Sequence, residues 1–261
     1  MTPAPHGTFT PNPGAAPLGR QVLAQSRMET KLLLRNGEQL LLAVGIPLIV
    51  LVGGTLAAER VGLDFAHRAI DTLTPGVLAL AIMSTSFTSL AITTGFERRY
   101  GVLKRLGTSP LPRSGLLTGK LGALLLVELL QVLVIGLVAF LLGWSPVVTL
   151  AGLVGVLGYV VLGTAAFASL GLLVAGSLRA EATLAAANLI YLLLLAGGAV
   201  VFPLSTYGDF GEVLAWLPSG ALGTGMRAAL SDGSVALSPL LVLLGWTVLG
   251  TVATSRTFKW E

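Results

Sequence analysis

Six stretches of the chain are apolar over the length that a helix needs to cross a lipid bilayer. A hydrocarbon core of ~30 Å is spanned by about 20 helical residues. The six stretches cover roughly residues 39–58, 74–95, 116–142, 148–176, 184–203 and 235–255. The sequence therefore predicts an all-α membrane protein, in which residues 39–261 form a six-transmembrane-helix bundle.

The composition leaves too little polar surface for a water-soluble domain. Hydrophobic residues make up 54% of the 261 residues and charged residues only 11%, whereas soluble domains carry about 25% charged residues. The chain has no cysteine, which excludes disulfides and thiolate metal sites, and its two histidines, His6 and His67, argue against a histidine-built metal site. We expect no metal and no cofactor to be bound by this chain.

The distribution of Lys and Arg predicts the orientation in the membrane. Cytoplasmic loops of membrane proteins carry an excess of these residues. The two termini and the loops at 96–115 and 177–183 fall on one side if the chain crosses six times, and that side holds Arg20, Arg27, Lys31, Arg35, Arg98, Arg99, Lys104, Arg105, Arg113, Lys120, Arg179, Arg256 and Lys259, against Arg60, Arg68 and Arg227 opposite. We therefore expect cytoplasmic N- and C-termini, and attribute the net charge of +4 to orientation in a membrane rather than to binding of nucleic acid.

The residues before the first span divide into a tail and a helix. Residues 1–19 are rich in proline and small side chains, which predicts a disordered cytoplasmic tail. Residues 20–38 have helical periodicity and place four basic side chains on one narrow stripe: Arg20, Arg27, Lys31 and Arg35. This pattern fits an amphipathic helix at the membrane surface, facing anionic lipid headgroups, and it also fits a solvated helix leading into the first span.

The longest cytoplasmic loop carries a recognisable pattern. It reads Glu97-Arg98-Arg99-Tyr100-Gly101-Val102-Leu103-Lys104-Arg105-Leu106-Gly107-Thr108-Ser109-Pro110. This resembles the ABC-2 permease family, whose loop between spans two and three follows E-R-x-x-G-x-L-x-x-L-x-x-S/T-P. A weaker resemblance lies at Trp216-Leu217-Pro218 and Met226-Arg227. The chain looks closest to the antibiotic and multidrug exporter branch found in actinobacteria, and the resemblance implies the type V exporter-like architecture of this family.

The same loop has the properties of a helix that docks on a partner protein. A short amphipathic helix over 97–110 would place Leu103 and Leu106 one turn apart, where they could insert into a groove on that partner. The residues expected to couple the chain to an ATPase in this way are Glu97, Arg98, Arg99, Gly101, Leu103, Lys104, Leu106, Ser109 and Pro110. A plain positive-inside loop is the alternative, but it would not explain Glu97 or the leucine spacing.

The chain lacks the motif with which many ATPases bind nucleotide. No stretch fits G-x-x-x-x-G-K-S/T, because Gly119-Lys120 is followed by Leu121 and has the wrong glycine spacing. The chain is therefore not expected to be an enzyme. If it is an active transporter, ATP and Mg bind in a separate ABC ATPase subunit, and two permease chains, identical or different, pair to match two ATPase subunits.

Some polar residues lie within the apolar stretches. Glu128 is the only acidic residue well inside a span, Gln131 shares its helix face, and Thr88 belongs to a hydroxyl-rich second span. These residues could line a translocation path or form polar contacts within the bundle. The stretch at about 204–230 is too rich in glycine and proline for one span, so we expect short re-entrant helices there, with a surface loop as the alternative.

Taken together, these features predict a multi-pass permease subunit in the cell membrane. Its expected function is ATP-driven export of a hydrophobic or amphipathic compound, such as an antibiotic, a drug or a lipid. Export of a lipid-linked glycan is possible within the same family. A secondary transporter or channel without an ATPase partner is the alternative class, although no internal repeat is evident and Glu128 alone gives it little support.

Overall fold

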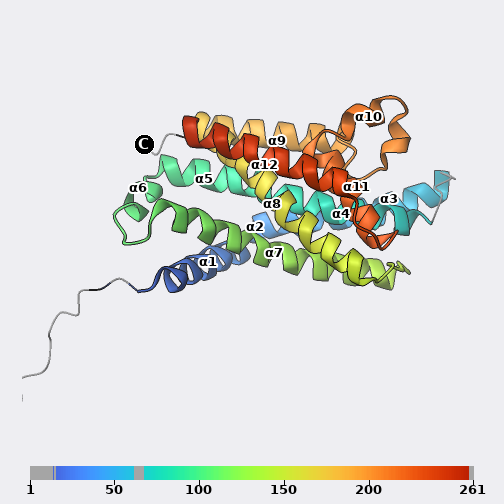
Figure 1. Cartoon of the computed structure of the whole chain (residues 1–261), viewed down its shortest axis with the longest axis horizontal. Coiled ribbons are helices and arrows are strands. Elements are labelled where there is room, and N and C mark those ends of the chain that lie inside the picture. The colour runs from blue at the N-terminus through green and yellow to red at the C-terminus, as the bar shows by residue number, and fades with distance from the viewer. Residues whose placement is uncertain (1–13, 15, 62–67, 259–261) are drawn as a thin grey trace, which may run out of the picture.

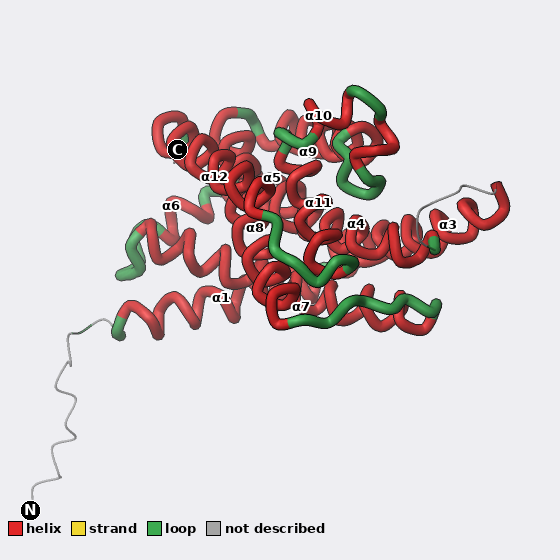
Figure 2. The backbone as a smooth tube through the Cα atoms, turned by 45° about the vertical axis from the view of Figure 1, so that its right-hand side comes forward, coloured by secondary structure: helices red, strands yellow, loops and turns green. Residues whose placement is uncertain are grey.

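Helices account for most of the described backbone. The computed structural model describes residues 14, 16–61 and 68–258, and over these residues it contains helices and no strand. Figure 2 shows the helices in red, joined by short loops. Most of the predicted tail over 1–19, together with both histidines, lies outside the described residues.

Five helices are long and apolar enough to cross a membrane, and a shorter one accompanies them. The five are Ala69–Arg99, Arg113–Leu141, Leu150–Ser177, Ala180–Gly197 and Leu237–Thr257, and the shorter apolar helix is Ala43–Ala58. They correspond in order to the six predicted spans, which confirms an all-α multi-pass membrane fold. The first helix (α1, Leu18–Arg35), the short helix α6 (Val102–Leu106) and the C-terminal end lie at one end of the bundle (Figure 1).

The first two spans are built from several helical segments. Span one joins α2 (Gly37–Leu40), a π-helical turn η1 (Leu41–Gly45) and α3 (Ile46–Val61). Span two joins α4 (Ala69–Met83), a second π-helical turn η2 (Ser84–Ser89) and α5 (Leu90–Arg99). π-helical turns break the regular i to i−4 hydrogen bonding and often occur where function needs an irregular helix.

Span two forms the centre of the protein. It packs against α3, α7 (Arg113–Leu141), α8 (Leu150–Ser177) and α9 (Ala180–Gly197). In its most apolar stretch of 18 residues, 78% is buried inside the protein. Phe87 meets Phe167 of α8 edge to face, with ring centroids 6.5 Å apart. The outer helices instead expose large apolar side chains such as Leu133, Leu157 and Leu249. Such an apolar exterior suits lipid as the solvent, not water.

The segment between spans five and six folds into the bundle. It contains η3 (Leu204–Tyr207), α10 (Phe210–Leu214) and α11 (Pro218–Leu230), followed by α12 (Leu237–Thr257). Helix α11 packs against α4, α8 and α12, and most of its residues are buried. The alternative of a surface loop over 204–230 is therefore wrong for α11, while its depth in the membrane stays a prediction.

Span five ends earlier than the sequence predicts. The predicted limit was residue 203, but α9 stops at Gly197 and Ala199 adopts a φ of 51°. The non-helical backbone that follows is fully buried, and the Arg227 guanidinium of α11 donates to the carbonyls of Val200 (3.0 Å) and Val201 (2.7 Å). A distant side chain thus satisfies two carbonyls of buried, non-helical backbone.

Candidate functional site: the cytoplasmic turn between spans two and three

The loop pattern from Glu97 to Pro110 does not form one helix over 97–110. Helix α5 ends at Arg99, Gly101 has a φ of 69°, and α6 covers only Val102–Leu106. A left-handed residue ends a helix because its backbone closes the last turn, and glycine adopts it without a steric penalty. The predicted single helix is therefore wrong, and Gly101 is the point at which the chain turns from α5 into α6.

The end of this turn is fixed by short polar contacts. The Ser109 hydroxyl donates to the Leu106 carbonyl (2.6 Å) and the Thr108 hydroxyl to the Arg105 carbonyl (2.7 Å). Pro110 is exposed just beyond them, and α7 begins at Arg113. The predicted stop of the helix at Ser109-Pro110 thus falls three residues beyond the end of α6.

Leu103 does not face a partner protein. Its side chain is 3% exposed, and α6 packs against α5. The prediction that Leu103 inserts into a groove on an ATPase is therefore wrong, because the residue anchors α6 to its own bundle. Leu106 is half-buried, whereas Lys104 and Arg105 are exposed, and a hollow of about 400 Å³ lies beside them. The surface that α6 offers to other proteins is thus mainly basic.

Glu97 belongs to a buried ion cluster rather than to an exposed rim. The Lys120 ammonium lies 2.8 Å from Glu97 Oε1 and 2.9 Å from Glu29 Oε1. The Gln25 amide also donates to Glu29 Oε1, at 2.8 Å. The side chains of Lys120, Glu29 and Glu97 are 5%, 8% and 15% exposed. This ion cluster joins three helices, because Glu29 lies on α1, Glu97 on α5 and Lys120 on α7.

Arg98 and Arg99 tie the turn to a second cytoplasmic loop. The Arg98 guanidinium donates to the carbonyls of Gly176 (2.7 Å) and Leu178, at the C-terminal end of α8. Arg99 forms an ion pair with Glu181 in the first turn of α9, and its guanidinium lies 5.8 Å from the ring centre of Tyr100. A cation at the end of a helix satisfies open carbonyls and interacts favourably with the helix dipole. The Glu97-Arg98-Arg99 run therefore contacts α7, α8 and α9 directly, and Lys120 links it to α1.

Helix α1 approaches α7 through its polar face. Gln25, Ser26 and Glu29 are buried there, while the apolar Leu23 and the basic Arg27 are exposed. Glycines on α7 make this approach possible, because a Cβ on Gly119 would lie 2.6 Å from Gln25 Cγ and one on Gly122 would lie 2.6 Å from Ser26 Oγ. The outward side of α1 thus combines the predicted basic stripe with apolar residues, as an interfacial helix requires.

The polar residues predicted inside the spans form contacts between helices. Glu128 is 0% exposed and accepts a hydrogen bond from the Thr164 hydroxyl of α8 at 2.5 Å. Gln131 is 1% exposed and is bonded to Thr85 and to the backbone of Ala43. Among the described residues, the Thr88 hydroxyl has no hydrogen-bond partner, so it does not join the other two. In this structure Glu128 and Gln131 therefore act as polar contacts within the bundle.

Sequence reasoning missed the partner of Lys120, although a signal was present. A charged side chain just inside a predicted span needs a partner of opposite charge or a route to water. Lys120 stands four residues into the predicted third span, and Glu97 was the nearest acidic residue across the loop. Glu29 could not be found in this way, because it lies 91 residues away in sequence.

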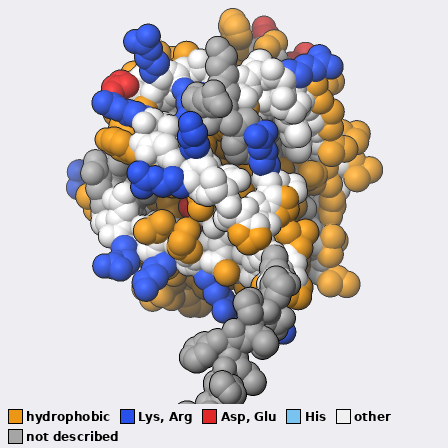
Figure 3. Space-filling view, turned by 90° about the vertical axis from the view of Figure 1, so that its left-hand side faces the viewer, with side chains coloured by type: hydrophobic (Ala, Val, Ile, Leu, Met, Phe, Trp, Pro, Cys, Tyr) orange, Lys and Arg blue, Asp and Glu red, His pale blue; other side chains and the backbone are white. Residues whose placement is uncertain are grey.

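The end of the bundle that carries this turn is basic. Figure 3 shows Lys and Arg side chains spread over that end and hydrophobic side chains along the flanks. The predicted cytoplasmic residues Arg20, Arg99, Lys104 and Arg256 are exposed. This distribution agrees with the orientation derived from Lys and Arg counts.

The apolar exterior, the five long apolar helices and the shorter sixth one define a multi-pass membrane protein. A family model described as ABC-2 family transporter protein matches residues 67–256, and the chain belongs to this family. The family consists of membrane permeases that work with an ABC ATPase, so the chain is a permease of the cell membrane rather than a catalyst. A search of curated proteins found no match.

Proposed function

We propose that this chain is the permease of an ATP-driven exporter for hydrophobic or amphipathic compounds, with ATP and Mg bound by a separate ATPase subunit. The observation that carries the proposal is the Glu97-Arg98 pair at the end of α5. Glu97 is bonded to Lys120 of α7, and Arg98 is bonded to the last turn of α8. A displacement of α6 would therefore be transmitted to α7 and α8 as well as to span two.

The exposed part of the turn supplies the docking surface in this proposal. Lys104 of α6 lines the hollow together with Ser109 and Pro110, and the neighbouring Arg105 is exposed. A partner with acidic residues would be steered and oriented by these side chains. Movement of the docked ATPase subunit would then tilt spans two and three against α8 and open a path between two paired permease chains.

The apolar character of the bundle favours amphipathic cargo over small ions. Glu128 and Gln131, the polar groups deepest in the third span, are both engaged in contacts between helices. A second permease chain, identical or different, would complete the path between two subunits. Export rather than import is proposed from the resemblance of the Glu97–Pro110 loop to the exporter branch of this family.

The test is co-purification of the tagged chain with its ATPase in mild detergent. Leu103→Asp is unsuitable because Leu103 is buried, so a charged side chain at this position would disrupt folding of the protein. The informative variant is Lys104→Glu combined with Arg105→Glu, and Arg256→Glu is its control, since this residue is an exposed cytoplasmic arginine on a different helix. We expect the first variant to lose the ATPase and the control to retain it.

Two other outcomes would contradict this proposal. If the wild-type chain retains no ATPase, and transport into sealed vesicles is indifferent to ATP, the exporter proposal fails and a secondary transporter becomes the leading function. If both variants retain the ATPase, docking does not use α6.

A further inference from the structure

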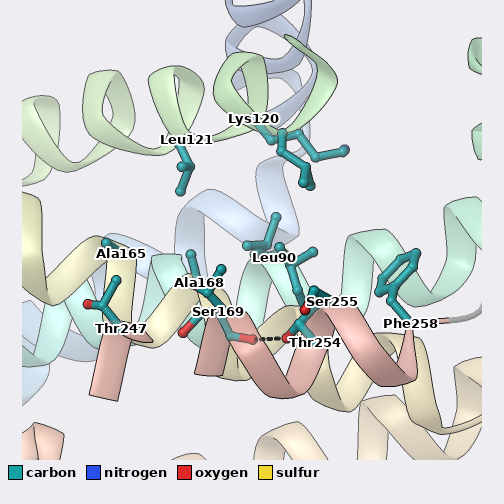
Figure 4. A pocket seen from close by; sticks show the side chains of 13 residues that line it. Leu90, Lys120, Leu121, Ala165, Ala168, Ser169, Thr247, Thr254, Ser255 and Phe258 are labelled. Carbon is teal, nitrogen blue, oxygen red and sulfur yellow. Dashed lines mark hydrogen bonds between the residues drawn. The ribbon is translucent and has the colours of Figure 1, made fainter. Parts of the chain in front are cut away.

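A lateral groove lies between α7 and α12 in the cytoplasmic half of the bundle. Its volume is about 460 Å³, within the range of about 300–1,000 Å³ that is typical of small-molecule sites. Figure 4 shows Leu121 of α7 on one side, Thr247 and Thr254 of α12 on the other, and Ala168 of α8 between them. Leu117 of α7 and Thr251 of α12 also line the groove. The groove is separate from Glu128 and Gln131, which do not line it.

The two walls differ in chemistry. The α7 wall is aliphatic, whereas α12 contributes a row of hydroxyl groups on one helix face, from Thr247 through Thr251 and Thr254 to Ser255. Thr247 donates to the Leu243 carbonyl (2.8 Å), Thr254 to the Ser169 carbonyl (2.8 Å) and Ser255 to the Val252 carbonyl (2.9 Å). Because these hydroxyls have already used their protons, their oxygens can act as acceptors.

The charged side chain among the groove's lining residues is already paired with other residues. The Lys120 side chain lines the groove, but its ammonium turns away toward the ion cluster (Figure 4). That cluster contains one cation, Lys120, and two carboxylates, Glu29 and Glu97. Among the described residues, Glu97 Oε2 is buried without a hydrogen-bond partner. Because the hydroxyl oxygens of α12 are left as acceptors, an ammonium, which only donates hydrogen bonds, complements the groove better than an anion, which only accepts them.

We propose that this groove binds a cationic amphiphile from the inner leaflet, with an aliphatic chain along Leu117 and Leu121 and an amine at the hydroxyl row. The inference rests on the proposed function, since it makes the groove the site at which the exporter takes up its substrate. Lys120 links the groove to the cytoplasmic turn, because the same side chain borders the ligand and holds Glu97. A bound ligand would thus touch the residue whose ion pair with Glu97 joins α7 to the turn.

The test uses cysteine protection in the full chain embedded in lipid nanodiscs. The protein has no native cysteine, so Thr251→Cys places a single thiol in the groove. Val248→Cys is the matched control, because Val248 lies three residues away on α12, is 54% exposed and does not line the groove. The rate of modification by a methanethiosulfonate reagent is measured with tetradecylamine, with tetradecyl sulfate and without either.

We expect tetradecylamine to slow modification of Thr251→Cys about tenfold, as for a site occupied about 90% of the time. The sulfate should have a much smaller effect, and Val248→Cys should be unaffected by both. Equal protection by the sulfate would overturn the preference for cations. Equal protection of the two cysteines would show partition into the bilayer instead of binding in the groove.

Two further results separate this inference from the proposed function. A spontaneous disulfide between two Thr251→Cys chains would assign the groove to a permease interface and overturn the binding site. The protection assay needs neither ATP nor the ATPase, so absence of protection in a protein that still performs ATP-driven transport would reject the groove alone. Protection in a protein that shows no dependence on ATP would leave the site in place and reject the exporter.

Discussion

The side-chain amide of Gln131 lies 2.8 Å from the backbone carbonyl of Ala43 and donates a hydrogen bond to it. Ala43 belongs to the π-helical turn of span one, and the same amide nitrogen lies 2.8 Å from the hydroxyl of Thr85 in the π-helical turn of span two. One residue of α7 therefore holds two irregular turns together in the interior of the bundle.

Replacing Gln131 with leucine should destabilise the protein by about 1–2 kcal/mol, because polar contacts between membrane helices contribute on this scale. For a chain of this size we expect the melting temperature in detergent to fall by several degrees. Leu133→Ala is the control, since Leu133 is 61% exposed on the lipid-facing side of the same helix. Equal melting of the Gln131→Leu variant and wild type would mean that the contact contributes nothing to stability.

The ion cluster should tolerate removal of all its charges better than removal of its cation. Lys120→Met leaves Glu29 and Glu97 buried together, and uncompensated buried charge typically costs about 3–5 kcal/mol. Combining it with Glu29→Gln and Glu97→Gln should recover most of this loss. The measurement is thermal unfolding of wild type, Lys120→Met and the triple variant in detergent. If the triple variant is no more stable than Lys120→Met, the two buried carboxylates do not depend on Lys120 for charge compensation.

Replacement of glycine by alanine should be harmful at Gly76 in span two and harmless at Gly53 in span one. A Cβ on Gly76 would lie 2.4 Å from the Val201 carbonyl oxygen, which is backbone and cannot move cheaply, so Gly76→Ala should strongly reduce folded yield. Gly53→Ala has nothing within 4 Å of its new Cβ and should leave stability unchanged or raise it by up to about 1 kcal/mol. Yield and melting temperature check both, and a harmless Gly76→Ala would disprove the close approach of residue 201.

The packing of α1 on α7 should depend on the glycines of α7. Gly119→Val places atoms where Gln25 now lies, so α1 should detach and become more sensitive to protease near its exposed basic residues. Gly136→Val is a suitable comparison, because the nearest neighbour of its Cβ is 4.0 Å away. We expect limited proteolysis to cleave the Gly119→Val variant faster and the Gly136→Val variant at the wild-type rate. Equal cleavage of both would indicate that α1 is held elsewhere.

The sequence by itself determined the membrane class and the order of the spans. Hydrocarbon accepts only long apolar helices, so composition over about 20 residues settles where they lie. The fourth span was predicted at 148–176 and is found at Leu150–Ser177. The loop pattern from Glu97 to Pro110 also pointed to the ABC-2 family, which the match over residues 67–256 confirms.

Only the tertiary structure decided which side of each segment meets which neighbour. Leucine spacing in α6 could not reveal that Leu103 faces its own bundle, because an amphipathic helix docks equally well on its own chain or on another. Lys120 pairs with Glu29, which lies 91 positions away, and Arg227 donates to the carbonyls of Val200 and Val201, which lie 27 and 26 positions away. Contacts between residues so far apart are set by how the helices pack, and local composition carries no information about them.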